Sequence, residues 1–374
     1  MSALDELRVT EAAAPRAPRR PVPRHAVLLV PAGVALLAGL DAALLLMGLP
    51  AAPVSTTRLP DVHGPVLVLG FLGTLISLER AVALGRPAGY VAPGAFGLGG
   101  LLLLSPAPPV YGGWTLVAGA AALVAVYVPL WRRQRDEAVL VQSLGAVLAV
   151  GAALLWTRGI EVPDLLPWLA GFVVLTIAGE RLELSRLTMA PEAGSRLVLL
   201  GAAFSAAAVA ALFWPHVGHP LLGVVVLVLV GWLTRHDVAR HTVHATGLSR
   251  FAALGMLLGY CWLAVTGAIW LGGTPDGPAY DAVVHAVFLG FTMSMVMAHA
   301  PVILPAVLRR PLPYRPAMLG PLLLLHGSLV VRLWLGDGLG STTLWRTGGV
   351  LNAVALVSFA GVAVWSATRS GAER

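Results

Sequence analysis

The chain has 374 residues, of which 57% are hydrophobic and only 11% are charged, and its mean hydropathy is +0.83. Soluble globular proteins contain about a quarter charged residues, so this composition excludes a soluble domain and predicts an all-α, polytopic membrane bundle. The net charge of +7 comes from 25 arginines scattered at the ends of apolar runs, which excludes a basic stripe for nucleic acid. The single cysteine, Cys261, excludes an internal disulfide.

Residues 1–24 are rich in proline and arginine and have no core-forming pattern, which predicts a disordered cytoplasmic tail. Residues 25–370 are predicted to form a single transmembrane helical domain. The first apolar run begins only after Arg24 and is long enough to span, so we expect an uncleaved helix. A span needs about 20 apolar residues. Twelve runs qualify, near 26–48, 61–79, 90–105, 111–131, 138–157, 165–180, 195–214, 219–234, 249–272, 281–307, 316–335 and 345–367.

The arginines predict how these spans are oriented. If the N-terminus is inside, the inner segments hold all the arginines except four. The four in outer segments are Arg58, Arg158, Arg332 and Arg346. Because positive charge collects on the cytoplasmic side, both termini are predicted to be cytoplasmic. Omitting one helix would invert the pattern from that point on, so the arginines also support the count of twelve.

Histidines inside the spans are the first candidates for function, because polar side chains in a membrane are costly. His63, His285, His299 and His326 lie within predicted spans. The other six are expected to be interfacial: His25, His216, His219, His236, His241 and His244. His285 and His299 lie fourteen residues apart on one helix, hence about 40° apart around its axis and about 21 Å along it. Diheme b-type cytochromes use the same spacing.

His63 and His285 are predicted to lie at equal depth near the outer face. His63 follows Asp61 by two residues and His285 follows Asp281 by four, which places both about 3–6 Å from the outer edge. Two imidazoles at one level match the bis-imidazole ligation of an iron. The alternative is that each imidazole is a hydrogen-bonding link between helices.

His299 and His326 are predicted to form a second, deeper pair. His299 precedes Arg309 by ten residues and His326 follows Arg315 by eleven, which places both about 15–17 Å from the inner edge. They are therefore candidate ligands of a second metal, with the same structural alternative. Pro301, two residues after His299, removes a helix hydrogen bond and predicts a distortion there.

Glycines and charged pairs accompany the histidines. Glycines near His63 and His285 offer a flat surface for a porphyrin or, more commonly, for a close-packed helix: Gly64, Gly70, Gly73 and Gly290. Two inner helix ends carry charged residues that we expect to form interfacial ion pairs, with proton uptake as the alternative. They are Glu79-Arg80 and Glu180-Arg181, followed by Glu183 and Arg186.

Twelve helices with both termini inside, a histidine at the outer end of helix 2 and histidine again on helix 10 resemble the haem–copper oxidase architecture. There, helices 2 and 10 supply the axial ligands of the low-spin haem, so the resemblance implies His63 and His285 as ligands of haem b. Two sequence segments also resemble the bacterial NnrS family. They are HGPVLVLGFLGTLISLERAVAL and HAVFLGFTMSMVMAHAPVILPAVLRRPLPYRP. The chain departs from the oxidases at their copper ligands, because 165–180 and 195–214 contain no histidine except His216 just beyond.

The NnrS resemblance implies a haem- and metal-binding, multi-pass protein of the bacterial cytoplasmic membrane, linked to nitric oxide or respiratory stress. Its expected cofactors are haem b with copper or a second haem, and its expected partners are the lipid bilayer and membrane respiratory proteins. Two alternatives stay open: a secondary transporter with twelve helices, and an assembly or scaffold subunit with structural histidines. Transporters usually show paired broken helices, whereas the Pro301 and Pro305 interruption has no counterpart in the first half.

Overall fold

The computed structural model describes residues 23–49, 58–185 and 192–369, and every regular element in these ranges is helical. Twelve helices are long and apolar enough to cross a membrane, which confirms the predicted all-α bundle and its count. The spans are Arg24–Leu46, Leu59–Leu84, Pro87–Leu104, Pro109–Gln134, Glu137–Thr157, Val162–Ser185, Ala193–Phe213, Pro215–His236, Gly247–Leu271, Gly277–Leu308, Pro316–Asp337 and Thr342–Arg369. Most of the predicted tail, residues 1–22, lies outside the described residues.

Several spans combine more than one helical element. The α-helices are α1 (Leu29–Leu46), α2 (Leu59–Pro65), α3 (Gly73–Leu84), α4 (Val91–Leu104), α5 (Pro109–Gln134), α6 (Glu137–Thr157), α7 (Val162–Ser185), α8 (Ala193–Phe213), α9 (Pro215–His236), α10 (Ala239–Thr242), α11 (Gly247–Leu271), α12 (Gly277–His285), α13 (Ser294–Leu308), α14 (Leu319–Val330) and α15 (Thr342–Arg369). Short 3₁₀ turns, Arg24–Leu28, Pro87–Tyr90 and Pro316–Met318, begin three of the spans.

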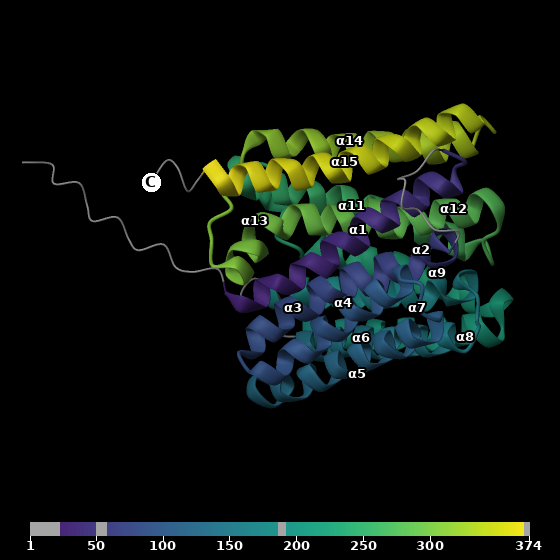
Figure 1. The fold of residues 1–374 in the computed structure, drawn as a ribbon. Coiled ribbons are helices and arrows are strands. Elements are labelled where there is room, and N and C mark those ends of the chain that lie inside the picture. The colour runs from purple at the N-terminus through teal and green to yellow at the C-terminus, as the bar shows by residue number, and fades with distance from the viewer. Residues whose placement is uncertain (1–22, 50–57, 186–191, 370–374) are drawn as a thin grey trace, which may run out of the picture.

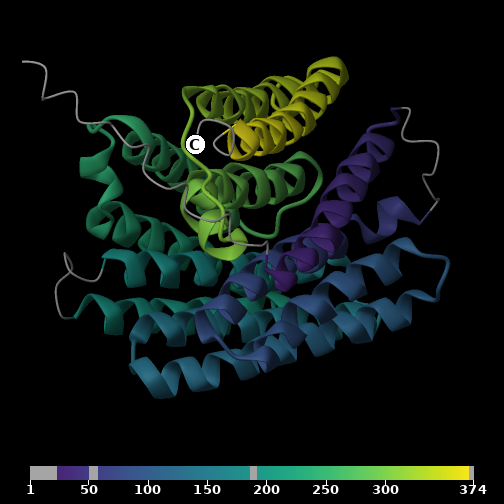
Figure 2. The ribbon, with the colours of Figure 1, turned by 60° about the vertical axis from the view of Figure 1, so that its left-hand side comes forward.

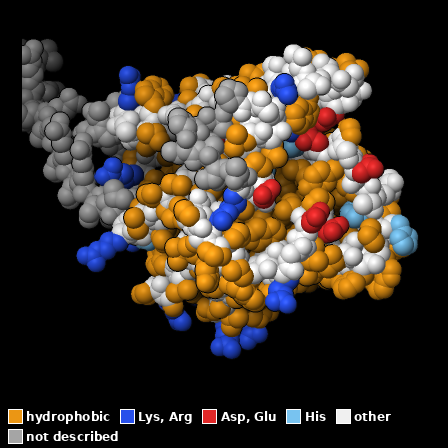
Figure 3. All heavy atoms as spheres, turned by 45° about the vertical axis from the view of Figure 1, so that its right-hand side comes forward, with side chains coloured by type: hydrophobic (Ala, Val, Ile, Leu, Met, Phe, Trp, Pro, Cys, Tyr) orange, Lys and Arg blue, Asp and Glu red, His pale blue; other side chains and the backbone are white. Residues whose placement is uncertain are grey.

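Helices that follow one another in the chain mostly pack as antiparallel neighbours. The pairs α4 with α5, α6 with α7, and α14 with α15 share extensive contacts. Figures 1 and 2 show α14 and α15 along one side of the bundle, with α5 and α6 on the opposite side. Helix α7 is central, because 78% of its most apolar stretch is buried, compared with 22% in the first span. Hydrophobic side chains cover much of the face shown in Figure 3, as contact with lipid requires.

The two ends of the described chain lie at the same end of the bundle (Figure 1). We call this the terminus end and the opposite one the distal end. His25, at the start of the first span, contacts the Val307 carbonyl near the end of α13 at 2.9 Å and stacks on Tyr90. At the terminus end, these contacts hold the start of the first span against α13 and against Tyr90. That this end faces the cytoplasm stays a prediction from the arginines.

Three spans contain a π-helical segment, which has one extra residue per hydrogen-bonded ring. They are η2 (Val66–Leu72), η5 (Ala286–Met293) and η7 (Val331–Asp337). The span with η2 carries His63, the span with η5 carries His285 and His299, and the span with η7 carries His326. Pro65 cannot donate a hydrogen bond, so it loosens the helix just before η2. In the tenth span the irregular segment precedes His299, whereas α13 runs without a break through Pro301, where we expected the distortion.

Glycines permit the closest helix contacts. A methyl group added at Gly70 would lie 3.2 Å from the Cα of Gly100, so η2 and α4 meet backbone to backbone. A methyl at Gly223 in α9 would lie 2.3 Å from the backbone nitrogen of Leu271 in α11. Small residues have this role wherever membrane helices approach closely.

The substitution Gly223→Ala should lower the free energy of unfolding by about 1–3 kcal/mol, because the backbone of α11 cannot yield space for the added methyl. Gly231→Ala in the same helix is the matched control, since no atom lies within 4 Å of its new methyl. That control should be neutral or more stable, because alanine favours the helix. Thermal unfolding in detergent measures both, and an equal effect of the two variants would contradict the packing argument.

Candidate functional site

His63 and His285 lie near the distal end on spans that touch each other. His63 is in α2 and His285 ends α12, and the two spans make contact farther along, between α3 and α13. The two imidazoles are close enough to interact electrostatically, and Arg332 lies within the same range of His63. The structure therefore brings the predicted outer pair together.

The ring of His63 is oriented by the first span. Its Nδ1 lies 2.9 Å from the carbonyl oxygen of Gly39 in α1. A carbonyl only accepts hydrogen bonds, so Nδ1 carries the proton and Nε2 of the neutral ring keeps its lone pair. Nε2 has no hydrogen-bond partner among the described residues. This is the arrangement of a metal-binding histidine, whose second nitrogen is held by a carbonyl.

His285 has the same arrangement within its own helix. Its Nδ1 lies 2.8 Å from the carbonyl oxygen of Asp281 and 3.3 Å from the carboxylate of that residue. Its Nε2 also has no hydrogen-bond partner in the described part of the chain. Each ring of the outer pair therefore offers one free lone pair, with its proton fixed on the other nitrogen.

A buried ion pair holds Asp281 in place beside His285. Arg332 donates to both carboxylate oxygens of Asp281, at 3.0 and 2.8 Å, and its guanidinium lies 4.8 Å from the ring centre of Trp345. Arg332 is only 6% exposed and lies inside the eleventh span. The arginine pattern placed Arg332 in an outer segment; in the bundle its side chain is buried, because a bidentate pair with a carboxylate allows arginine to be buried.

His299 is held in a different network, toward the terminus end. Nη1 of Arg181 lies 3.0 Å from Nε2 of His299, and the carbonyl of Met295 lies 2.7 Å from its Nδ1. Arg181 also makes two hydrogen bonds, of 2.7 and 3.0 Å, to the carboxylate of Asp237. Tyr260 donates to the same carboxylate. Since arginine only donates, Nε2 of His299 is an acceptor, and both ring nitrogens are occupied.

His326 is likewise bonded at both nitrogens. The indole of Trp262 donates to its Nδ1 at 2.8 Å, so the proton is on Nε2, which lies 3.0 Å from the hydroxyl of Ser294. His299 and His326 therefore have separate sets of partners. Binding a metal would require each ring to give up a hydrogen bond, and the second metal site stays a prediction.

The glycines near the outer histidines take part in helix packing. An added methyl at Gly290 would meet Trp262 at 2.4 Å, and one at Gly73 would meet Phe96 at 2.9 Å. Together with the contact of Gly70 with Gly100, these distances favour close packing over a porphyrin surface at these positions.

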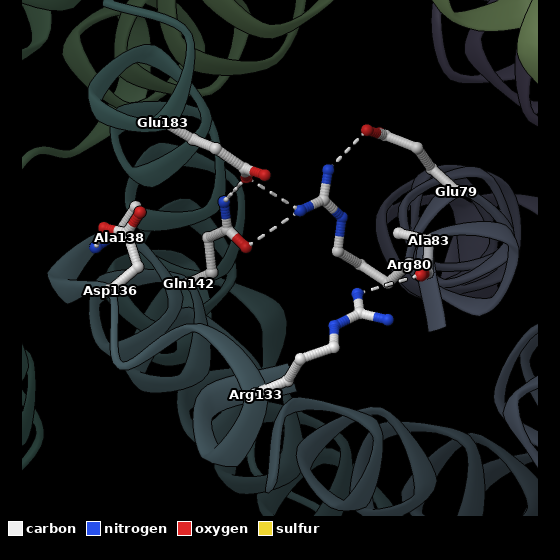
Figure 4. Close-up of polar contacts among 8 residues, drawn as sticks. All are labelled: Glu79, Arg80, Ala83, Arg133, Asp136, Ala138, Gln142 and Glu183. Carbon is white, nitrogen blue, oxygen red and sulfur yellow. Dashed lines mark hydrogen bonds and ion pairs between the residues drawn. The ribbon is translucent and has the colours of Figure 1, made fainter. Parts of the chain in front are cut away.

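Ion pairs expected from the sequence are present in part. Arg80 pairs with Glu79 and with Glu183 at 3.1 Å, and Figure 4 shows its guanidinium reaching between these two carboxylates. Arg181 pairs with Asp237 and not with its neighbour Glu180. The reason is helical geometry, because consecutive side chains on a helix point in different directions. Arg186 lies outside the described residues.

Sequence reasoning missed the groups that orient the outer histidines. Asp281 was used only as a depth marker, although its spacing of four residues from His285 is the spacing of helix neighbours. Neither Gly39 nor Arg332 could be assigned, because both lie on neighbouring spans and their contacts depend on how those spans pack. Two of the three π segments share a sequence signal, Leu-Gly-Phe at 69–71 and at 289–291.

A cavity of about 650 Å³ opens near the outer pair and contains no histidine. It is lined by the starts of α2, α5 and α7 and by the end of α6. Its polar walls are Arg58, Asp61 and Glu161. Arg58 is held in place by the carbonyls of Ser105 and Ala107.

The sequence profile of a family described as a domain of unknown function, DUF8744, matches residues 24–368. This match covers all twelve spans. No curated protein matches the chain.

The pair of Arg181 and Asp237 generates a stability prediction. Asp237 lies just beyond the end of α9 and is 1% exposed. Burial raises the pKa of its carboxyl, but hydrogen bonds and charge from Arg181, with Tyr260 and the Ala239 amide, outweigh burial and hold it below the usual 3.8. A lowered carboxyl pKa contributes stability above the unfolded-state value, and this contribution is lost as the pH falls through the folded-state value.

Asp237→Asn should therefore lower the free energy of unfolding by about 3–5 kcal/mol, because it leaves Arg181 buried without its counter-charge. The variant should also lose less stability than the wild type when the pH is lowered below 3.8. Glu192→Gln is the control, since its pair with Arg196 is exposed and should contribute at most about 1 kcal/mol. Thermal unfolding across a pH series tests this, and parallel acid profiles of wild type and Asp237→Asn would contradict it.

Proposed function

The chain belongs to the DUF8744 family, and from its geometry we propose that it is a haem-binding membrane protein with His63 and His285 as axial ligands. The observation that carries the proposal is a pair of imidazoles within electrostatic range of each other, each with its proton on Nδ1 and with no described hydrogen-bond partner at Nε2. A histidine that is only a link between helices uses both nitrogens, as His299 and His326 do.

The donor set fits haem b. Two neutral imidazoles from different helices are the axial ligands of low-spin b haems. The Nδ1 hydrogen bonds to Gly39 and Asp281 would fix the ring planes and increase the basicity of Nε2. Haem b would supply a redox-active iron when bound. Arg332 adds a fixed positive charge beside the site, which suits the propionates of a haem.

The link to nitric oxide or respiratory stress rests on the resemblance of the sequence around His63 and His285 to the NnrS family. Copper or a second haem at His299 and His326 has less support, because both nitrogens of each ring are occupied. We therefore restrict the proposal to one haem, at the outer pair, in a multi-pass membrane protein.

The two alternatives make different predictions about the same features. A secondary transporter built from two related halves would have interrupted helices at corresponding positions. Here the π segments lie in the second, tenth and eleventh spans, which do not correspond in two halves of six spans. A scaffold subunit would need no unpartnered nitrogen at His63 or His285. Uptake by proteoliposomes would favour the transporter, and a colourless protein that transports nothing would favour the scaffold.

Purified wild-type protein should show a Soret band, and His63→Ala and His285→Ala should each abolish or strongly reduce it, because each removes one axial ligand. Absorbance per mole of protein, with extraction of the haem, measures this. His236→Ala is the matched control, since its Nδ1 also bonds to the carbonyl four residues earlier, at 2.8 Å, but it lies at the terminus end of α9. Its band should be unchanged.

Imidazole added to His63→Gly or His285→Gly should restore the band, since the free base can occupy the space of the lost ring. This rescue separates a lost ligand from a misfolded protein. Either of two results would contradict the proposal. One is a wild-type protein that has no Soret band after growth with a haem precursor, and the other is a band that persists in both alanine variants.

A further inference from the structure

A second cluster of charged side chains lies toward the terminus end, away from the histidine pair. Its centre is Arg80 in α3, which donates to Glu79, to Gln142 at 3.2 Å and to Glu183 at 3.1 Å. Gln142 also donates to Glu183, at 3.3 Å. These residues come from α3, α6 and α7, and Figure 4 shows them converging on the guanidinium. Arg80 follows His63 by 17 residues, so the cluster lies about 25 Å along the span from the outer pair.

The hydroxyl of Tyr127 faces this cluster without a partner. Tyr127 is in α5, is 2% exposed and interacts electrostatically with Arg80, Glu79, Glu180 and Glu183. Its hydroxyl oxygen is buried and makes no hydrogen bond to any described residue. A buried hydroxyl without a hydrogen-bond partner costs about 1–3 kcal/mol. The unpaired hydroxyl of Tyr127 therefore points to a ligand or proton that completes its hydrogen bonding when bound.

Glu180 is the carboxylate of the cluster that has no partner. It lies in α7, one helical turn before Glu183 and five residues before the end of the span. It makes no hydrogen bond or ion pair with any described residue, although Glu79, Arg80 and Glu183 are within electrostatic range. The residue is partly exposed, and a carboxylate within a membrane span to which no cation bonds is unfavourable.

Among the described residues, the charges around Glu180 do not balance. Glu79, Glu180 and Glu183 are three carboxylates, and Arg80 is the single described guanidinium that bonds to any of them. Arg181 does not bond to Glu180, because it makes two hydrogen bonds to Asp237 and a third to His299. Glu79 and Glu183 share Arg80, and no described cation forms an ion pair with Glu180.

We propose that Glu180 is a proton-binding site, which holds an exchangeable proton as a neutral carboxylic acid facing Arg80 and Tyr127. A bound proton removes the uncompensated charge and gives Glu180 a donor, which the tyrosine oxygen can accept. A metal cation suits the cluster less, because the guanidinium of Arg80 already occupies the position between the carboxylates.

The exposed fractions of the neighbouring carboxylates indicate how a proton reaches Glu180 from solvent. The side chain of Glu183 is 36% exposed and that of Glu79 is 23% exposed, so both reach the surface at the terminus end. A proton taken from solvent by either carboxylate can pass to Glu180, whose oxygen forms the new O–H bond while the surface carboxylate regains its charge. The charged groups that face Glu180 are therefore Glu79 and Arg80 from α3, Tyr127 from α5, and Arg181 and Glu183 from α7 itself.

Infrared spectroscopy of the full-length protein in lipid nanodiscs tests the proposal, because a protonated carboxyl has a carbonyl stretching band of its own that shifts in D₂O. At neutral pH the wild type should show this band, and the difference spectrum against Glu180→Gln should assign it to Glu180. Glutamine resembles the neutral acid in shape, so this variant should remain folded. Glu192→Gln is the matched control, since Glu192 is exposed and paired with Arg196, and its spectrum should match the wild type.

Tyr127→Phe keeps Glu180 and removes only the hydroxyl, so the band should persist at a shifted frequency. An unshifted band in Tyr127→Phe, or a band that persists in Glu180→Gln, would overturn the proposal. So would loss of the band on adding sodium chloride in place of choline chloride, because a cation would then be the ligand. The measurement does not depend on haem, and the proposal stands or fails separately from the role of His63 and His285.

Discussion

A polar group in the hydrocarbon core of a membrane has no water to bond, and each unsatisfied group costs several kcal/mol. This constraint decides where nearly every charged residue of the bundle lies. Arg332 is buried because Asp281 accepts two of its hydrogen bonds, and Arg181 is buried because Asp237 does the same. The first pair joins the tenth and eleventh spans, and the second joins the sixth span to the residue that follows the eighth, so the ion pairs also define which spans are neighbours.

The constraint makes the exceptions informative. Nε2 of His63, Nε2 of His285 and the carboxylate of Glu180 have no partner in the described chain, whereas His299 and His326 are fully bonded. The exceptions lie at opposite ends of the bundle. A lone pair on imidazole suits a metal, and an unbalanced carboxylate suits a proton, so the two ends differ in chemistry.

The π-helical segments connect this chemistry to the backbone. Each of the three lies on a span that carries an intramembrane histidine. An extra residue in a helical turn rotates all later side chains relative to earlier ones, and such segments are frequent at functional sites. In the tenth span the segment lies between His285 and His299, so the angle of about 40° expected for an ideal helix does not hold, and the two rings join different networks.

The sequence alone determined the membrane class and the twelve spans, because hydropathy and charge are local properties. The equal depth of His63 and His285 is a prediction from helical rise. The sequence also predicted interfacial ion pairs for Glu79, Arg80 and Glu180, with proton uptake as the alternative. Only the tertiary structure decided which residues are partners. Arg181 forms its ion pair with Asp237 and not with Glu180, and Arg332 is buried beside His285. The carbonyl of Gly39 orients the ring of His63. These contacts depend on which helices are neighbours, and helices of uniform hydrophobicity carry little information about their neighbours.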